Sequence, residues 1–242
     1  MLAKTQSNTP SRVFEVDVLR GSAIVLMIIF HFGYDLAVFG WATYNTGIDI
    51  EWRIFRAMIV TGFLLAVGMS SYLAYHRKVD GKKLFKACAK LLLVSVFLTI
   101  SSVFMYPDTW IYFGIIHFIT VALFLSVPFV RIPNISAVLG TFIILGYGLD
   151  YISMHSLWLW SIDNIGIPQQ TVDLASFIPW FGVVLLGIFV MHKQCFNLSV
   201  PQRQLTKALA WLGKHSLVIY LLHQPIIYSG LSLIALIIDN PT

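Results

Sequence analysis

Seven apolar segments, each close to the length that crosses a bilayer, alternate with short polar connections along the chain. A transmembrane helix needs about 20 consecutive apolar residues to cross roughly 30 Å of hydrocarbon. A helix also satisfies every backbone polar group within its own segment, so we predict an all-α, polytopic membrane helix bundle. The segments cover residues 18–40, 54–75, 87–106, 110–130, 134–152, 174–192 and 208–238.

Two parts of this pattern are irregular. Segment 208–238 is long and contains Pro225, which predicts either a kink or a first turn that lies in the membrane interface. The connection at 153–173 contains two tryptophans, and we expect it to lie on the membrane surface or to dip into it. No repeat or change of composition divides the chain, so residues 1–242 are expected to form a single domain.

Composition supports a membrane protein and excludes several other classes. Charged residues make up 11% of the chain and the mean hydropathy is +0.81, whereas a soluble domain carries roughly a quarter charged residues. The net charge of +5 is compatible with nucleic-acid binding, but the basic residues fall in short loops between apolar segments. That distribution indicates membrane topology, so no nucleic-acid partner is expected.

Basic residues also predict the orientation. Loops rich in Lys and Arg stay on the cytoplasmic side of a membrane. With a cytoplasmic N-terminus, which carries Lys4 and Arg12, fourteen of the sixteen Lys and Arg lie on that side. The loop at 41–52 is then outside, and Arg53 and Arg56 are the two exceptions.

The first apolar segment carries three ionisable residues on one helical face. At about 100° per residue, Arg20 and His31 are only about 20° apart, and Asp35 follows one turn after His31. Such groups cost at least ~2.5 kcal/mol each at membrane depth, so they usually face an interior site. Asp35 is placed to accept a hydrogen bond from the His31 ring, which suits a general base or a nucleophile. The alternative is a packing histidine bonded to a neighbouring carbonyl.

Arg53 and Arg56 project to one side of the second segment because they are three residues apart. They can clamp an acidic acceptor, pair with Asp35 or stabilise a developing oxyanion. The structural alternative is that their side chains extend to lipid headgroups, with Glu51 as a partner.

His117 and His223 lie inside the fourth and seventh segments. A lone membrane histidine is usually a packing residue, but several in one small bundle favour a shared polar site with His31. Trp180, near the start of the sixth segment, suits a pocket wall or the membrane interface. No two histidines are four residues apart, and we expect no metal site.

Further basic residues gather near the expected cytoplasmic side. Lys82 and Lys83 belong to a basic loop that indicates topology and also suits an anionic ligand. Together with Arg20, Lys214 and His215 they can meet a polyanionic donor. The sequence contains no glycine-rich phosphate loop, so residue spacing does not decide between a topology signal and a ligand-binding role.

Short motifs along nearly the whole chain resemble a known family. The chain resembles small bacterial members of the heparan-α-glucosaminide N-acetyltransferase-like family. The matching motifs are DVLRG at 17–21, HFGYDL at 31–36, GIIH at 114–117, IPW at 178–180, GKHSL at 213–217 and YLLHQP at 220–225. The RIFR sequence at 53–56 also resembles the paired-arginine motif of the broader membrane acyltransferase superfamily.

This resemblance implies transmembrane acyl transfer in a bacterial cytoplasmic membrane. The donor would be acetyl-CoA or another acyl-CoA from the cytoplasm, and the acceptor an amino or hydroxyl group of an extracytoplasmic glycan. Residues 41–52, where the lysosomal relatives carry the catalytic histidine, contain none, so His31 takes that place in our hypothesis. Arg53, Arg56, His117, Trp180 and His223 would bind the acceptor. Membrane lipid is a further partner, and a homodimer is one assembly that the sequence allows.

The main rival is a proton-coupled transporter, because membrane histidines beside an aspartate also suit a proton relay. Seven unequal segments without an inverted repeat argue against most secondary transporters. A lipid-binding membrane subunit without catalysis is a second rival. Binding of coenzyme A separates acyl transfer from both.

Overall fold

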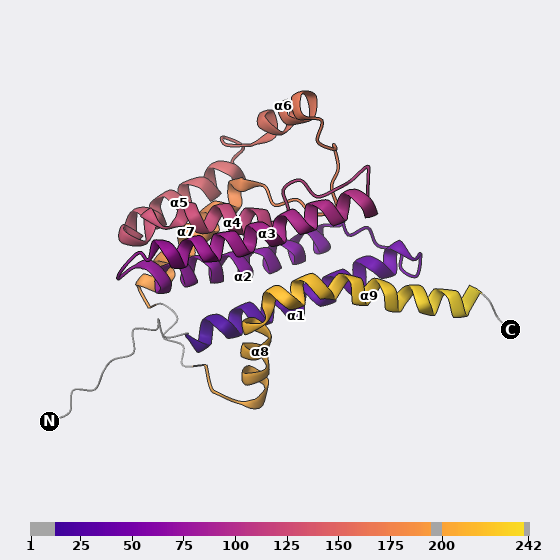
Figure 1. Cartoon of the computed structure of the whole chain (residues 1–242), viewed down its shortest axis with the longest axis horizontal. Helices are drawn as coiled ribbons and strands as arrows, with labels where there is room; N and C mark the ends of the chain where they lie inside the picture. Colours follow the sequence, from indigo (N-terminus) through magenta and orange to yellow (C-terminus); the bar gives the residue numbers. More distant parts are fainter. Residues whose placement is uncertain (1–12, 195–199, 240–242) are drawn as a thin grey trace. The chain divides into compact units, whose positions relative to one another are not determined.

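The computed structural model describes residues 13–194 and 200–239, so Lys4, Arg12 and Cys195 lie outside the described part. All regular structure in the described ranges is helical, as the hydropathy pattern predicts (Figure 1). The α-helices are α1 (Phe14–Val38), α2 (Ile50–Tyr75), α3 (Gly81–Met105), α4 (Ile115–Ser126), α5 (Pro133–Gly148), α6 (His155–Ile165), α7 (Phe177–His192), α8 (Gln204–Lys214) and α9 (Ser216–Asp239). A short 3₁₀-helix, η1 (Pro128–Arg131), follows α4.

Four of these helices, α1, α2, α3 and α9, are long and apolar enough to cross a membrane, as expected of an integral membrane protein. Helices α4, α5 and α7 are apolar but have only 12, 16 and 16 residues. At 1.5 Å per residue they are ~18, ~24 and ~24 Å long, less than the hydrocarbon thickness. Seven crossings therefore stay a prediction.

The described residues form two compact units. We call residues 67–194 the middle unit, and residues 13–66 with 200–239 the terminal unit. Helix α2 contributes its first part to the terminal unit and its last part to the middle unit. The single domain over 1–242 stays a prediction.

In the middle unit, α5 and α7 cross where two glycines meet. A Cβ on Gly140 would lie 2.7 Å from the carbonyl oxygen of Gly182, so only glycine permits this approach. The predicted segment 110–130 is not one helix. Helix α4 begins only at residue 115, and the segment ends in the 3₁₀-helix η1. Thr99 and Ser102 of α3 bind the carbonyl oxygen and the N–H of Ile111, which holds the preceding chain in an irregular conformation.

The terminal unit has a compact apolar core formed by Ile24, Met27, Phe30 and Ile59. Helix α1 packs against both α8 and α9 around this core, since Leu212 of α8 and Ile219 of α9 contact it.

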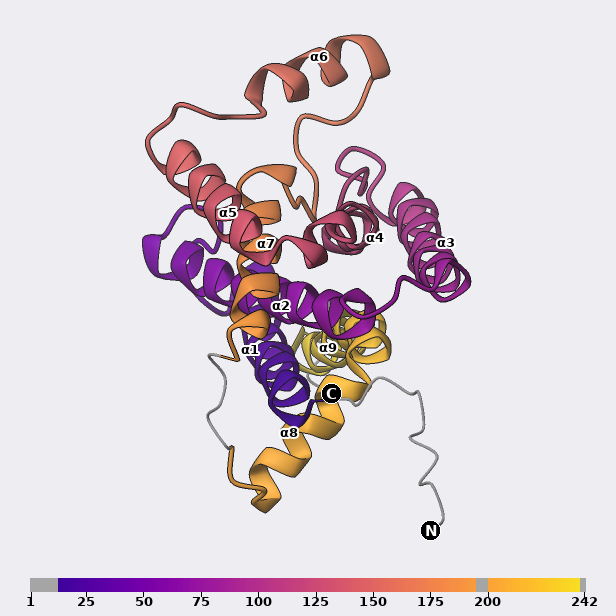
Figure 2. The same ribbon diagram turned by 90° about the vertical axis from the view of Figure 1, so that its left-hand side faces the viewer.

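The predicted segment 208–238 is two helices rather than one, and whether its first part lies in the membrane interface stays a prediction. The break is at His215, whose φ of −103° and ψ of 14° end α8. Pro225, the expected break, lies inside α9. Helix α8 runs across α1 and α9 instead of along them (Figures 1 and 2). Contact with α1 holds it there, because a Cβ on Gly213 would clash with the Asp17 carbonyl oxygen.

Candidate functional site

A polar cluster joins α1 and α9 within the terminal unit. His31 and Asp35 are one turn apart on α1, so they share a face, and α9 supplies His223 and Gln224 opposite them. The centroids of the two imidazole rings are 4.8 Å apart, with an interplanar angle of 61°. The Gln224 Nε2 donates a hydrogen bond to Asp35 Oδ1 at 2.8 Å. The structure therefore brings together His31, Asp35 and His223, three of the four residues that the sequence hypothesis places in one shared site.

The expected hydrogen bond between Asp35 and His31 is not formed. The carboxylate of Asp35 is 1% exposed, and it accepts its hydrogen bond from Gln224 instead. His31 Nδ1 is buried and makes no hydrogen bond within the described residues. The packing alternative, a ring nitrogen bonded to a neighbouring carbonyl, describes His223, whose Nδ1 lies 2.7 Å from the Tyr220 carbonyl oxygen.

Four buried polar atoms of this cluster have no hydrogen-bond partner in the described part of the chain. They are His31 Nδ1, Asp35 Oδ2, His223 Nε2 and Gln224 Oε1. More than about 90% of buried polar groups in proteins are hydrogen-bonded. Four unpaired atoms in one place therefore indicate a site where a polar ligand or water completes the hydrogen bonds. In a neutral His223, Nδ1 carries the proton that the Tyr220 carbonyl accepts, so Nε2 presents a lone pair to the cluster.

An apolar pocket of about 280 Å³ opens beside His223. Three of its lining residues, Val218, Leu222 and Ile226, are more than half exposed, so it is an open groove on the surface of the unit. It is lined by Ile28, Val218, Ile219, Leu222, His223, Ile226 and Ile227.

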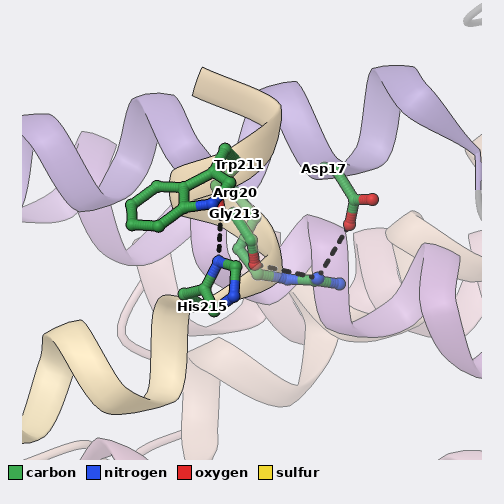
Figure 3. Close-up of polar contacts among 5 residues, drawn as sticks. All are labelled: Asp17, Arg20, Trp211, Gly213 and His215. Atoms are coloured by element: carbon green, nitrogen blue, oxygen red, sulfur yellow. Dashed lines mark hydrogen bonds and ion pairs between the residues drawn. The ribbon is translucent and has the colours of Figure 1, made fainter. Parts of the chain in front are cut away.

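Arg20 lies at the other end of α1, where α8 crosses it. Eleven residues separate it from His31 along the helix, which is ~16 Å. Its guanidinium forms an ion pair with Asp17 at 3.3 Å and donates to the Gly213 carbonyl oxygen at 3.5 Å (Figure 3). Lys214 and His215 follow directly and are exposed, and the His215 ring packs on Trp211. The structure thus brings three of the five predicted donor-binding residues to one helix crossing.

The other two predicted donor-binding residues, Lys82 and Lys83, belong to the middle unit. Both side chains are exposed in the first turn of α3, where Asp80 caps the helix by accepting from the Lys83 N–H at 3.1 Å. Their position relative to Arg20 stays a prediction.

His117 is also in the middle unit, and both of its ring nitrogens serve packing. Nδ1 accepts from the Gly114 N–H at 3.2 Å, which caps the start of α4. Nε2 lies 3.0 Å from Thr99 Oγ1, and because that hydroxyl donates to Ile111, it accepts from the ring. This geometry favours the packing alternative for His117. Trp180 is half-buried in the first turn of α7.

Arg53 and Arg56 are exposed near the start of α2. The structure shows no hydrogen bond or ion pair of either side chain with the residues it describes, so the suggested pairing with Asp35 is not formed. Both guanidinium groups remain compatible with an acceptor or with lipid headgroups.

Sequence reasoning missed Gln224. Its amide at membrane depth, beside His223, was a usable signal, because polar side chains there seek partners on neighbouring helices. Within residues 13–194 and 200–239, no group of three or more His, Cys, Asp or Glu lies close enough to hold a metal ion.

Comparison with known proteins gives one family. The family model described as heparan-alpha-glucosaminide N-acetyltransferase, catalytic, matches residues 12–225. No curated protein and no solved structure matches the chain significantly.

Proposed function

Because the chain belongs to the heparan-α-glucosaminide N-acetyltransferase catalytic family, we propose that it is a transmembrane acyltransferase. It moves an acyl group, acetyl in the simplest case, from cytoplasmic acyl-CoA to an amino or hydroxyl group of an extracytoplasmic glycan. The family match covers residues 12–225 and includes the whole α1 cluster together with His223 and Gln224.

The observation that carries this proposal is the set of unpaired buried atoms between α1 and α9. A general base needs a ring nitrogen with a free lone pair beside the group that it deprotonates. His31 Nδ1 and His223 Nε2 are both unpaired, and their rings are in contact. We assign the general base to His31, because His31 is partly exposed whereas His223 is buried with its Nδ1 bonded to the Tyr220 carbonyl oxygen.

The chemistry follows from this arrangement. His31 takes the proton from the acceptor nitrogen or oxygen as that atom attacks the thioester carbonyl of the donor. The carbon–sulfur bond then breaks, and the leaving thiolate takes the proton back from the His31 imidazolium. Asp35 Oδ2 orients the acceptor by accepting a hydrogen bond from it, and the apolar pocket beside His223 holds the methyl end of the acyl group.

The donor's phosphates bind at the crossing of α1 and α8. Arg20, Lys214 and His215 supply positive charge there, and guanidinium and ammonium groups form charge-assisted hydrogen bonds with phosphate oxygens. Arg53 and Arg56 bind the glycan acceptor. A donor-binding role for Lys82 and Lys83 and an acceptor-binding role for Trp180, all in the middle unit, stay predictions.

This mechanism requires a defined topology. We propose seven crossings, with the N-terminus, the α2–α3 loop and α8 on the cytoplasmic side and the loop at 41–52 outside. The short helices α4, α5 and α7 supply the other three crossings, and in this topology fourteen of the sixteen Lys and Arg fall on the cytoplasmic side, which supports the orientation. A bacterial cytoplasmic membrane is the proposed location.

Two measurements on the purified full-length protein in nanodiscs test the proposal. Calorimetry with acetyl-CoA is expected to show binding, weakened when Lys214 is replaced by Gln. Radiolabelled acetyl transfer is then measured to a panel of amino- and hydroxyl-bearing saccharides. A folded protein that binds no coenzyme A would overturn acyl transfer and favour a transporter.

A further inference from the structure

Helix α8 does not have the geometry of a helix that crosses the membrane. Its 11 residues span ~16 Å, about half the hydrocarbon thickness, and it runs across α9, which is long enough to cross the membrane (Figures 1 and 2). If α9 crosses the bilayer, α8 therefore lies close to the membrane plane. The Gly213 contact with α1 fixes it in that direction.

One face of α8 is buried, and the opposite face exposes apolar side chains beside basic ones. Ala210 and Gly213 pack against α1, whereas Leu205 and Trp211 are 72% and 58% exposed. Ala208 is exposed between them. A helix that leaves a leucine and a tryptophan uncovered on one side has the pattern of a helix lying at a membrane surface.

The charges beside this apolar strip are all of one sign. Arg203 and Lys207 are exposed, Lys214 lies on the same face as Lys207 two turns further along, and residues 200–238 contain no Asp or Glu. Basic residues at a membrane surface are attracted to anionic headgroups. The apolar strip therefore matches the acyl chains of an anionic lipid leaflet, and the positive charges match its headgroups.

We propose that α8 is an interfacial helix that binds the anionic lipid surface of the leaflet on its side of the membrane. Leu205, Ala208 and Trp211 enter the boundary between headgroups and acyl chains, and Arg203 and Lys207 contact the headgroup phosphates. Since α8 is fastened to α1 through Gly213 and Arg20, lipid binding fixes the depth of the α1 N-terminal end.

The test measures the depth of α8 in vesicles. Ala208→Cys is made with Cys88 and Cys195 replaced by Ser, labelled with a fluorophore, and the full-length protein is reconstituted with phospholipids brominated near the headgroup. Leu233→Cys, on an exposed face of α9, and Lys78→Cys, in an exposed loop, give the deep and aqueous references. Vesicles of phosphatidylcholine are compared with vesicles that also contain phosphatidylglycerol.

The label at Ala208 is expected ~5–10 Å into the boundary region, between the two references, and deeper when phosphatidylglycerol is present. Neutralising Arg203 and Lys207 to Gln should abolish that lipid-dependent shift, whereas neutralising Lys86 and Lys90 on α3 should preserve it. Quenching equal to the Lys78 reference would place α8 in water, and quenching equal to the Leu233 reference would place it inside the hydrocarbon. Either result, or a depth independent of phosphatidylglycerol, overturns the proposal.

Discussion

Two glycines of the terminal unit should respond in opposite directions to the same substitution. A Cβ added at Gly213 would clash with the Asp17 carbonyl oxygen and lie 2.8 Å from its carbon and 3.0 Å from the Gly21 nitrogen. These are backbone atoms, so no side-chain rotation relieves the contact and α8 must move away from α1. A Cβ added at Gly230 in α9 meets no atom within 4 Å.

The magnitudes follow from these contacts. Overpacking costs about 1–3 kcal/mol. Replacing a helical glycine by alanine recovers about 0.5–1 kcal/mol. Gly213→Ala is therefore expected to lower the free energy of unfolding by up to ~2.5 kcal/mol, and Gly230→Ala to raise it by up to ~1 kcal/mol. Reversible unfolding in mixed micelles with increasing SDS, followed by circular dichroism, measures both. Equal stability of the two variants would refute the proposed close crossing of α1 and α8.

The remaining predictions concern the cluster, the middle unit and the topology. Replacing Asp35 and Gln224 by Ala, singly and together, should give a coupling energy of ~0.6–1.7 kcal/mol, the range for hydrogen bonds between membrane helices, and additive losses would contradict it. His117→Ala should cost ~0.5–2 kcal/mol of stability by removing a helix cap, with acyl transfer retained, and loss of transfer in a folded protein would restore its acceptor role. A cysteine at Ile48, which is 73% exposed, should react with a membrane-impermeant maleimide on intact cells, and one at Lys78 should not; the reverse pattern would invert the topology.

Helical periodicity predicts much of the cluster because it depends only on residues of one helix. The spacing of His31 and Asp35 places them on one face of α1, and the structure confirms it. The hydropathy pattern likewise predicts the ends of α1 and α2 to within four residues and those of α3 to within six. Periodicity says nothing about which neighbouring helix faces that side, so the hydrogen bond from Gln224 to Asp35 was not predictable from spacing.

Breaks in helices were less predictable, because contacts distant in sequence produce them. The predicted apolar segment continues through Lys214 and His215, and no proline marks a break there. The chain nevertheless turns at this point, where Gly213 packs on α1. The late start of α4 similarly depends on hydroxyls of α3 that bind Ile111. Only Gly114, immediately before α4, marked that start in the sequence.

The central claim is that His31 deprotonates the acceptor of an acyl group, and acetyl transfer by the His31→Ala variant tests it most directly. Wild type, His31→Ala and His117→Ala are compared in nanodiscs with radiolabelled acetyl-CoA and an acceptor that the wild type uses. We predict that His31→Ala loses ~10²–10⁴-fold in turnover, the typical contribution of a general base, and still binds coenzyme A. His117→Ala should transfer at close to the wild-type rate. Turnover of His31→Ala close to that of wild type would contradict the claim.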